Sequence, residues 1–325
     1  MNHLSVPSFA KINWNLQILG RRPDGYHEVT TLLQTISLHD DLHFEATGDG
    51  VISLSCDDPD IPSDFPIDDQ NLIVRAAAAL KHRYRVNQGA RVRLEKRIPI
   101  KAGLGGGSSN AAVSLLTLAR LWKVETKATV LLEIAATLGA DVVFFLLGGC
   151  GLATGIGTTV SLIPDSSDNE SKHLIVIKPN ASVSTVKAYA ALRSPALTTS
   201  HLEPILSSSL IEADSPDLHP WPLQESLKND FESVIFDIEP EIRRAKEALL
   251  QAGALGALLA GSGSSVFGIF ADQEDQQRAL TEIKLEAGWR VFPCVTVSRN
   301  EYVRAVGARD ILFARSFNPE SDSGA

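Results

Sequence analysis

The residues best suited to chemistry form a glycine-rich stretch between Ile98 and Ala112. Four glycines, Gly103 and 105–107, fall within five residues there, and a backbone without Cβ atoms can approach a ligand closely. The apolar residues that follow, from Ala111 to Trp122, recur at intervals of three and four, which predicts a helix that one of residues 108–110 can cap. Because a helix N-terminus offers free N–H groups and partial positive charge, a glycine loop leading into one favours phosphate binding.

Two better-known glycine loops do not fit this spacing. The P-loop requires a lysine directly after its last glycine, whereas Ser108 follows Gly107 here. The dinucleotide fingerprint requires a glycine at its last position, where this chain again has Ser108, and an acidic residue in a βαβ unit. The remaining alternative is a surface loop without a ligand, and the position between a strand and a well-patterned helix favours phosphate binding over it.

Two charged residues, Lys11 and Asp141, interrupt apolar segments elsewhere in the chain. Lys11 alternates with apolar residues over 9–18, which predicts a half-buried strand, and Asp141 directly precedes the apolar run 142–145. Taken singly, the lysine would face solvent, and the aspartate would cap a helix or lie in a turn. If the two meet beside the glycine loop, the carboxylate would orient a substrate hydroxyl or accept its proton, and the ammonium would lower the pKa of that hydroxyl.

Two further segments carry polar or aromatic groups at turns. The sequence Gly261-Ser262-Gly263-Ser264 lies between apolar strands, and an ordinary tight turn and a ligand contact explain it equally well. Tyr26 and His27 follow a Pro- and Gly-containing turn at 20–25 and are suited to stacking on, and hydrogen bonding with, a planar ligand. That dipeptide by itself indicates little.

The elements that must position these residues are of both types. Apolar alternation or short apolar runs predict strands at 9–18, 30–38, 41–44, 90–94, 173–178 and twice within 256–270. Three- and four-residue spacing predicts helices at 71–85, 130–138, 240–251 and 272–286. Because strands and helices interleave without a long parallel βαβ rhythm, an α+β fold is favoured over a doubly wound sheet.

Length, composition and charge restrict the class of protein. The chain has 325 residues, of which 44% are hydrophobic and 21% charged, so a globular protein of two domains is expected. Its three cysteines lie far apart, which argues against a disulfide framework or a cysteine-built zinc site. The formal net charge of −9 disfavours nucleic acid as a partner. No targeting segment or membrane-spanning stretch is recognised, so a cytoplasmic protein with no membrane partner is expected.

Five motifs occur together in an order and spacing that resemble those of the GHMP small-molecule kinases. They are SFAKIN at 8–13, RRPDGYHE at 21–28, GLGGGSSNAA at 103–112, LGAD at 138–141 and GSGS at 261–264. The resemblance extends from Ser8 to about Phe270, and the segment 24–27 is similar to a cytidine-binding turn. It implies a two-domain α+β GHMP kinase fold, with a ribosomal-protein-S5-like ATP domain that contains a left-handed βαβ unit and a ferredoxin-like C-terminal domain. We therefore expect domains at 1–170 and 171–316, followed by a frayed tail at 317–325.

The resemblance also implies roles for individual residues. Lys11 and Asp141 match the catalytic pair, with Asp141 as the base or the orienting group for the attacking hydroxyl. The residues that match ATP contacts are Pro99, Gly103, Leu104, Gly105, Gly106, Gly107, Ser108, Ser109, Gly261, Ser262 and Gly263. Those that match substrate contacts are Asn13, Tyr26, His27, Thr185 and Tyr189, the last as the second ring of a cytosine sandwich. ATP and Mg²⁺ are the implied cofactors, and a serine hydroxyl of the loop is one candidate metal ligand.

The activity implied is ATP-dependent phosphorylation of the 2-hydroxyl of a small molecule, 4-diphosphocytidyl-2-C-methyl-D-erythritol, in the non-mevalonate isoprenoid pathway, by a monomer or weak homodimer. The alternatives are a GHMP kinase for another alcohol such as mevalonate or homoserine, a diphosphomevalonate-type decarboxylase, and a catalytically inactive binding protein. Tyr26 and His27 argue against another alcohol, and the presence of both Lys11 and Asp141 argues against an inactive protein.

The chain departs from the family pattern at three places. Val143 stands where a proline is usual, and Lys101-Ala102 replaces small or glycine residues ahead of the loop. A Ser- and Pro-rich stretch at 193–222 is longer than usual. None of these departures removes a residue of the predicted catalytic pair.

Overall fold

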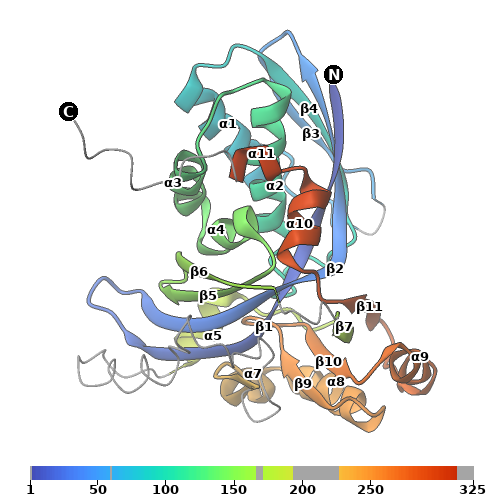
Figure 1. Cartoon of the computed structure of the whole chain (residues 1–325). Helices are drawn as coiled ribbons and strands as arrows, with labels where there is room; N and C mark the ends of the chain where they lie inside the picture. Colours follow the sequence, from blue (N-terminus) through green and yellow to red (C-terminus); the bar gives the residue numbers. More distant parts are fainter. Residues whose placement is uncertain (1, 59–60, 166–170, 193–226, 313–325) are drawn as a thin grey trace.

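The computed structural model describes residues 2–58, 61–165, 171–192 and 227–312, which form two β-sheets covered by helices (Figure 1). The first sheet has seven strands among these residues, five of them in the order β3–β4–β2–β1–β8, with β5 pairing to β2 and β6 pairing to β5. Their bounds are β1 His3–Arg21, β2 His27–Thr47, β3 Ile52–Ser55, β4 Gly89–Glu95, β5 Cys150–Gly155, β6 Thr159–Ile163 and β8 Lys228–Asn229.

The antiparallel pair β1 and β2 organises this sheet. The separate strands predicted at 30–38 and 41–44 are one strand, because β1 continues to pair with β2 across a shift in register between Phe9 and Ala10. The alternation predicted for the first strand is confirmed by its packing. Ala10 belongs to an apolar layer that also contains side chains of the second sheet, whereas Lys11 faces a cavity on the opposite side of β1. Lys11 is nevertheless buried and does not face bulk solvent.

The helices around the first sheet pack partly on its strands and partly on one another (Figure 1). They are α1 Leu72–Tyr84, α2 Gly106–Leu121, α3 Ala128–Leu138, α4 Ala140–Leu147, α10 Arg299–Val306 and α11 Arg309–Leu312. The helices predicted at 71–85 and 130–138 are therefore confirmed, and Asn71 caps α1 by accepting a hydrogen bond from the Ile73 amide. Because β3 and β4 are parallel and α1 connects them, this half contains a βαβ unit.

The second sheet has four antiparallel strands in the order β11–β7–β10–β9. The strands are β7 His173–Lys178, β9 Gly256–Leu259, β10 Val266–Phe270 and β11 Arg290–Val295. Helices α5 Thr185–Ala191, α7 Glu232–Ile238 and α8 Pro240–Gln251 lie in the chain between β7 and β9, and α9 Gln273–Glu282 lies between β10 and β11. The spatial order of fourth, first, third and second strand is that of a ferredoxin-like sheet, so the predicted α+β two-domain architecture is confirmed.

Two predicted segments lie outside the described residues, namely the stretch 193–222 and the tail 317–325. Among the helices that the structure describes, none combines the length and the apolar character needed to cross a bilayer. The three cysteines are free thiols.

Candidate active site

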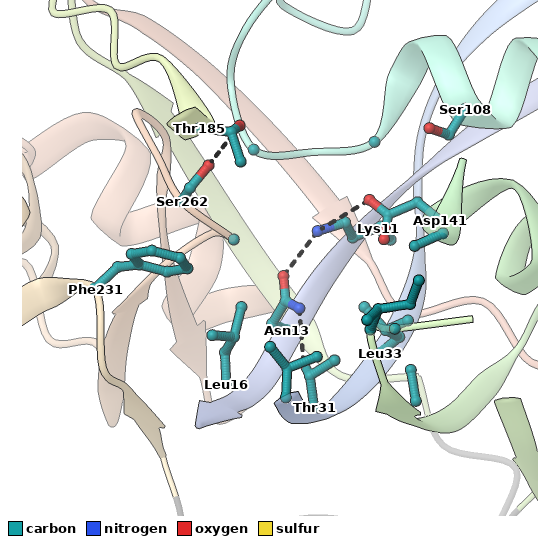
Figure 2. Close-up of a pocket in the computed structure, with 18 of the residues that line it drawn as sticks. Lys11, Asn13, Leu16, Thr31, Leu33, Ser108, Asp141, Thr185, Phe231 and Ser262 are labelled. Atoms are coloured by element: carbon teal, nitrogen blue, oxygen red, sulfur yellow. Dashed lines mark hydrogen bonds and ion pairs between the residues drawn. The ribbon is translucent and has the colours of Figure 1, made fainter. Parts of the chain in front are cut away.

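A cavity of about 390 Å³ lies where β1 and β2 meet the glycine loop, the start of α4 and the Gly–Ser turn (Figure 2). Four of the five motifs contribute to its wall. The predicted site residues that line it are Lys11, Asn13, Gly103, Gly105, Ser108, Asp141, Thr185, Tyr189, Gly261 and Ser262. Segments that are remote in the sequence are thus brought to one place.

The predicted catalytic pair meets in this cavity. Lys11 Nζ lies 3.7 Å from Asp141 Oδ2, and the two side chains are 5% and 38% exposed (Figure 2). Asp141 is the second residue of α4, which follows α3 directly through Gly139, and a carboxylate in the first turn of a helix is stabilised by the helix dipole. The arrangement places a buried ammonium beside a solvent-accessible carboxylate, as a reaction at a substrate hydroxyl requires.

Asn13 holds the ammonium from the other side. Lys11 Nζ donates to Asn13 Oδ1 at 2.9 Å, and Asn13 Nδ2 donates to Thr31 Oγ1 at 2.8 Å. The Thr31 hydroxyl in turn donates to the Asn15 carbonyl oxygen at 2.6 Å. These three bonds fix which end of the Asn13 amide faces the lysine, so Asn13 positions Lys11 in addition to lining the cavity.

We expect Thr31→Val to lower kcat by up to about tenfold, because losing one hydrogen bond costs about 0.5–1.5 kcal/mol and frees the Asn13 amide to turn. The KM for nucleotide should change little, since Thr31 does not line the second cavity described below. Steady-state kinetics of Thr31→Val beside Thr31→Ser, which keeps the hydroxyl, tests this. Equal kcat values for the two variants would contradict the assigned role of Thr31.

The two glycine motifs pack directly on each other and on β1. The Lys11 amide donates to the Leu104 carbonyl at 3.0 Å, and the Ser265 amide donates to the Ala102 carbonyl at 3.1 Å. A Cβ on Gly261 would lie 3.0 Å from the Gly103 carbonyl oxygen and 3.3 Å from Lys11 Nζ. Only residues without side chains allow this approach, which explains why both turns are rich in glycine.

A second cavity of about 400 Å³ lies along the glycine loop. Its lining includes Pro99, every residue from Lys101 to Ser108, and the apolar side chains of Phe65 and Leu72. Gly103, Gly105 and Ser108 border both cavities, so a phosphate chain lying over the loop would reach from the second cavity to Lys11. The loop leads directly into α2, whose first N–H groups favour the binding of anions.

Ser109 lies outside both cavities. Its hydroxyl is buried and accepts a hydrogen bond from Ser8 Oγ at 2.8 Å. Successive residues of a helix point about 100° apart, so Ser108 and Ser109 do not face the same side of α2. Ser109 therefore links α2 to β1 through this hydrogen bond. Of the two serines, Ser108 is the one that lines the cavity.

The aromatic end of the first cavity is formed by Tyr189, whose ring stacks on His27 at 4.7 Å between centroids and packs edge-on against Phe231 at 4.9 Å. Burial raises the pKa of the Tyr189 phenol to about 12, so it stays neutral. Burial, with a smaller contribution from Arg21, lowers the pKa of His27. Tyr26 is 62% exposed, and neither Tyr26 nor His27 belongs to the lining of the cavity.

The two hydroxyls at the far wall, Thr185 Oγ1 and Ser262 Oγ, are 3.0 Å apart and hydrogen-bonded (Figure 2). Thr185 is the first residue of α5, and this bond joins that helix to the Gly–Ser turn. Gly263, in the same turn, lines a neighbouring cavity and is not part of the lining of this one.

Two buried polar residues that support the site are not predicted from the sequence. Asp40 is fully buried, and its carboxylate accepts hydrogen bonds from Lys96 Nζ, the amides of 97 and 98, and Asn110 Nδ2. It thereby holds both ends of the glycine loop. Asn229 donates from Nδ2 to the carbonyls of Leu259 and Gly261, both at 2.8 Å, and supports the Gly–Ser turn. In the sequence Asp40 stands between His39 and Asp41, and Asn229 between Lys228 and Asp230, so no local pattern marks either residue as buried or names its partners.

Comparison with known proteins agrees with this geometry. Residues 71–149 match the model of the GHMP kinases N terminal domain, and residues 222–287 match that of the GHMP kinases C terminal domain. A 4-diphosphocytidyl-2-C-methyl-D-erythritol kinase of Chlorobium phaeobacteroides is 39% identical over 293 residues, which cover 90% of this chain and 94% of the relative. One of Pelotomaculum thermopropionicum is 40% identical over 271 residues, covering 83% and 90%.

Solved structures extend the comparison. A crystal structure of 4-(cytidine 5'-diphospho)-2C-methyl-D-erythritol kinase superposes with a TM-score of 0.70 at 32% identity, covering 90% of this chain and 99% of the other. A homoserine kinase from Cytophaga hutchinsonii, at 19% identity and a TM-score of 0.69, shares the fold. The chain therefore belongs to the GHMP kinases and, within them, to the family of 4-diphosphocytidyl-2-C-methyl-D-erythritol kinases.

Proposed function

We propose that this chain transfers the γ-phosphoryl group of ATP to the 2-hydroxyl of 4-diphosphocytidyl-2-C-methyl-D-erythritol. The observation that carries the proposal is the Lys11–Asp141 pair, 3.7 Å apart in a cavity whose wall includes the glycine loop. The family supplies the substrate, because the relatives described above carry the name of this kinase. They give no support to the decarboxylase alternative or to a kinase for another alcohol.

In the proposed reaction, the substrate hydroxyl oxygen forms a bond to the γ-phosphorus while the bond between that phosphorus and the bridging oxygen of ADP breaks. Asp141 orients the hydroxyl and accepts its proton, and the Lys11 ammonium offsets the negative charge on the attacking oxygen. The N–H groups at the start of α2 hold the phosphates. Phosphoryl transfer depends on such positioning and charge stabilisation more than on covalent help from the protein.

Mg²⁺ fits the oxygen donors that line the cavity. Asp141 offers a carboxylate and Ser108 a hydroxyl, and Mg²⁺ needs few protein ligands because it keeps several waters and binds substrate phosphates. When bound, the ion would neutralise part of the charge of the phosphate chain. Within the described ranges, no group of three or more His, Cys, Asp or Glu side chains offers a separate metal site.

A coupled assay of ADP release tests the proposed function. Purified protein is mixed with ATP, Mg²⁺ and the cytidyl substrate, with mevalonate and homoserine as parallel acceptors and a control without acceptor. We expect ADP release only with the cytidyl substrate, together with a product that mass spectrometry finds one phosphoryl group heavier. Release of carbon dioxide with phosphate, or equal turnover of another alcohol, would overturn the proposal.

The aromatic end of the cavity is proposed to bind cytosine against Tyr189. We expect Tyr189→Leu to weaken binding of CDP by about tenfold, since stacking of a base on an aromatic ring contributes about 1–3 kcal/mol. Tyr189→Phe, which keeps the ring, should retain the affinity. Calorimetric titration with CDP and with ATP checks this, because ATP affinity should not change. An equal loss of both affinities would show that the variant disturbs the cavity as a whole.

A cytoplasmic location, as a monomer or weak homodimer, is part of the same proposal. It is supported by the three unpaired cysteines and by the requirement for ATP. Sedimentation of the purified chain measures its oligomeric state.

A further inference from the structure

Lys101 has an unusual backbone conformation for its residue type. Its φ is +52°, in the left-handed region that residues with a Cβ rarely adopt, and it directly precedes Ala102 and Gly103 at the start of the glycine loop. Glycine would adopt this conformation without strain. A long charged side chain at a strained position beside a binding loop points to a use for that side chain.

Lys101 lies where a nucleotide would bring negative charge. It lines the cavity of about 400 Å³ along the glycine loop, and also a neighbouring cavity of about 550 Å³ that Gly103 lines too. The lining of the first of these contains two cations, Lys96 and Lys101, and no carboxylate. The chain as a whole has a net charge of −9, so a polyphosphate needs local positive charge at its site.

The other cations that line the first two cavities, Lys96 and Lys11, are already engaged. Lys96 Nζ donates to both oxygens of the buried Asp40 carboxylate and to the Ile98 carbonyl, which uses all three of its N–H groups. Lys11 is shared between Asn13 and Asp141. Lys101 is exposed and forms no ion pair with any residue in the described part of the chain. Its ammonium is therefore available to a ligand.

We propose that Lys101 is an additional phosphate-binding residue of this chain, whose ammonium pairs with the phosphate groups of the nucleotide held on the glycine loop. The inference rests on the proposed use of ATP. Two observations carry it jointly: the strained position in the loop, and an unpaired charge that borders the nucleotide cavity. Lys101 would contribute to affinity through its charge alone, because neither adenine nor ribose carries a negative group for it to bind.

Calorimetric titration of the full chain with Mg·ATP and with adenosine tests this. We expect Lys101→Gln to weaken ATP binding by about tenfold, the lower end of what a charge-assisted hydrogen bond contributes, and to leave adenosine binding unchanged. The affinities of Lys101→Arg for ATP and for adenosine should stay within a few-fold of those of the unmodified chain. Because salt screens charges, raising the salt concentration should reduce the difference in ATP affinity between Lys101→Gln and the unmodified chain.

A pair of glycine variants separates the charge from the backbone. Lys123, in the turn after α2, has nearly the same φ of +53° but lies outside the lining of the nucleotide cavity. Neither Lys101→Gly nor Lys123→Gly should lower the melting temperature, since glycine suits this conformation. Only Lys101→Gly should lose ATP affinity.

Three results would overturn the inference. They are unchanged ATP affinity in Lys101→Gln, an equal loss for adenosine and ATP, and an equal loss in the two glycine variants. If the unmodified chain binds ATP no more tightly than adenosine, the proposed role of Lys101 is wrong, although the nucleoside site remains supported. If it binds no nucleotide at all, the proposed function fails first and this inference fails with it.

Discussion

Asp141→Asn is expected to lower kcat by about 10²–10⁴-fold, the range for loss of a positioned general base. Asparagine has nearly the same shape but cannot accept the proton of the substrate hydroxyl, and its amide has no charge to pair with the Lys11 ammonium 3.7 Å away. Because Asp141 is 38% exposed, water can replace the lost contact, so the substitution should cost little folding stability. Single-turnover measurement of phosphoryl transfer isolates the chemical step from binding.

The same variant should still bind ATP, since the glycine loop and the start of α2 are unchanged. Calorimetry with ATP and a thermal melt serve as controls. The ATP affinity and the melting temperature of the variant should both be close to those of the unmodified chain. Asp141→Glu keeps the carboxylate but moves it by one methylene, so it should recover part of the rate. Turnover of Asp141→Asn near that of the unmodified chain would remove Asp141 from the mechanism.

The catalytic pair illustrates what residue patterns can and cannot predict. Alternation along 9–18 correctly separates Lys11 from the apolar face of β1, and the apolar run after Asp141 indicates a buried element. The distance between the two residues depends on tertiary packing, because α4 packs on α2 and the first turn of α2 lies beside Lys11. Local sequence carries no information about that packing. The contact between Lys11 and Asp141 can therefore be predicted only from the resemblance of the motifs to a family.

The supporting residues were missed for a related reason. Asp40 lies in β2 between His39 and Asp41, so its neighbours in the sequence do not mark it as the buried centre of a hydrogen-bond network. Its partners come from the end of β4 and from α2, which are distant in the sequence. The resemblance predicts Ser109 as an ATP contact because it belongs to a continuous motif, and in the structure the period of the helix turns its hydroxyl toward Ser8.

Gly103→Ala is expected to weaken nucleotide binding by about a hundredfold. The residue has a φ of +77°, and a Cβ there would overlap sterically with the Ala260 carbonyl oxygen and lie 3.0 Å from the Gly263 carbonyl oxygen. Both neighbours are backbone atoms of the Gly–Ser turn, so the two turns must move apart. Loss of about two charge-assisted hydrogen bonds to phosphate accounts for a change of this size. Fluorescence titration with an ATP analogue measures it.

The overlap should also lower the free energy of unfolding by about 2–4 kcal/mol, the combined cost of a left-handed non-glycine residue and overpacking. Gly107→Ala is the matched control for stability, because its Cβ would have only Leu72 Cδ1 nearby, at 3.9 Å, in an ordinary helical turn. If Gly103→Ala unfolded at the same denaturant concentration as Gly107→Ala and bound nucleotide normally, the close packing of the two turns would not matter. If it lost affinity while staying as stable as the control, the turns would separate without strain, and the site would owe its shape to Asp40 and Asn229 instead.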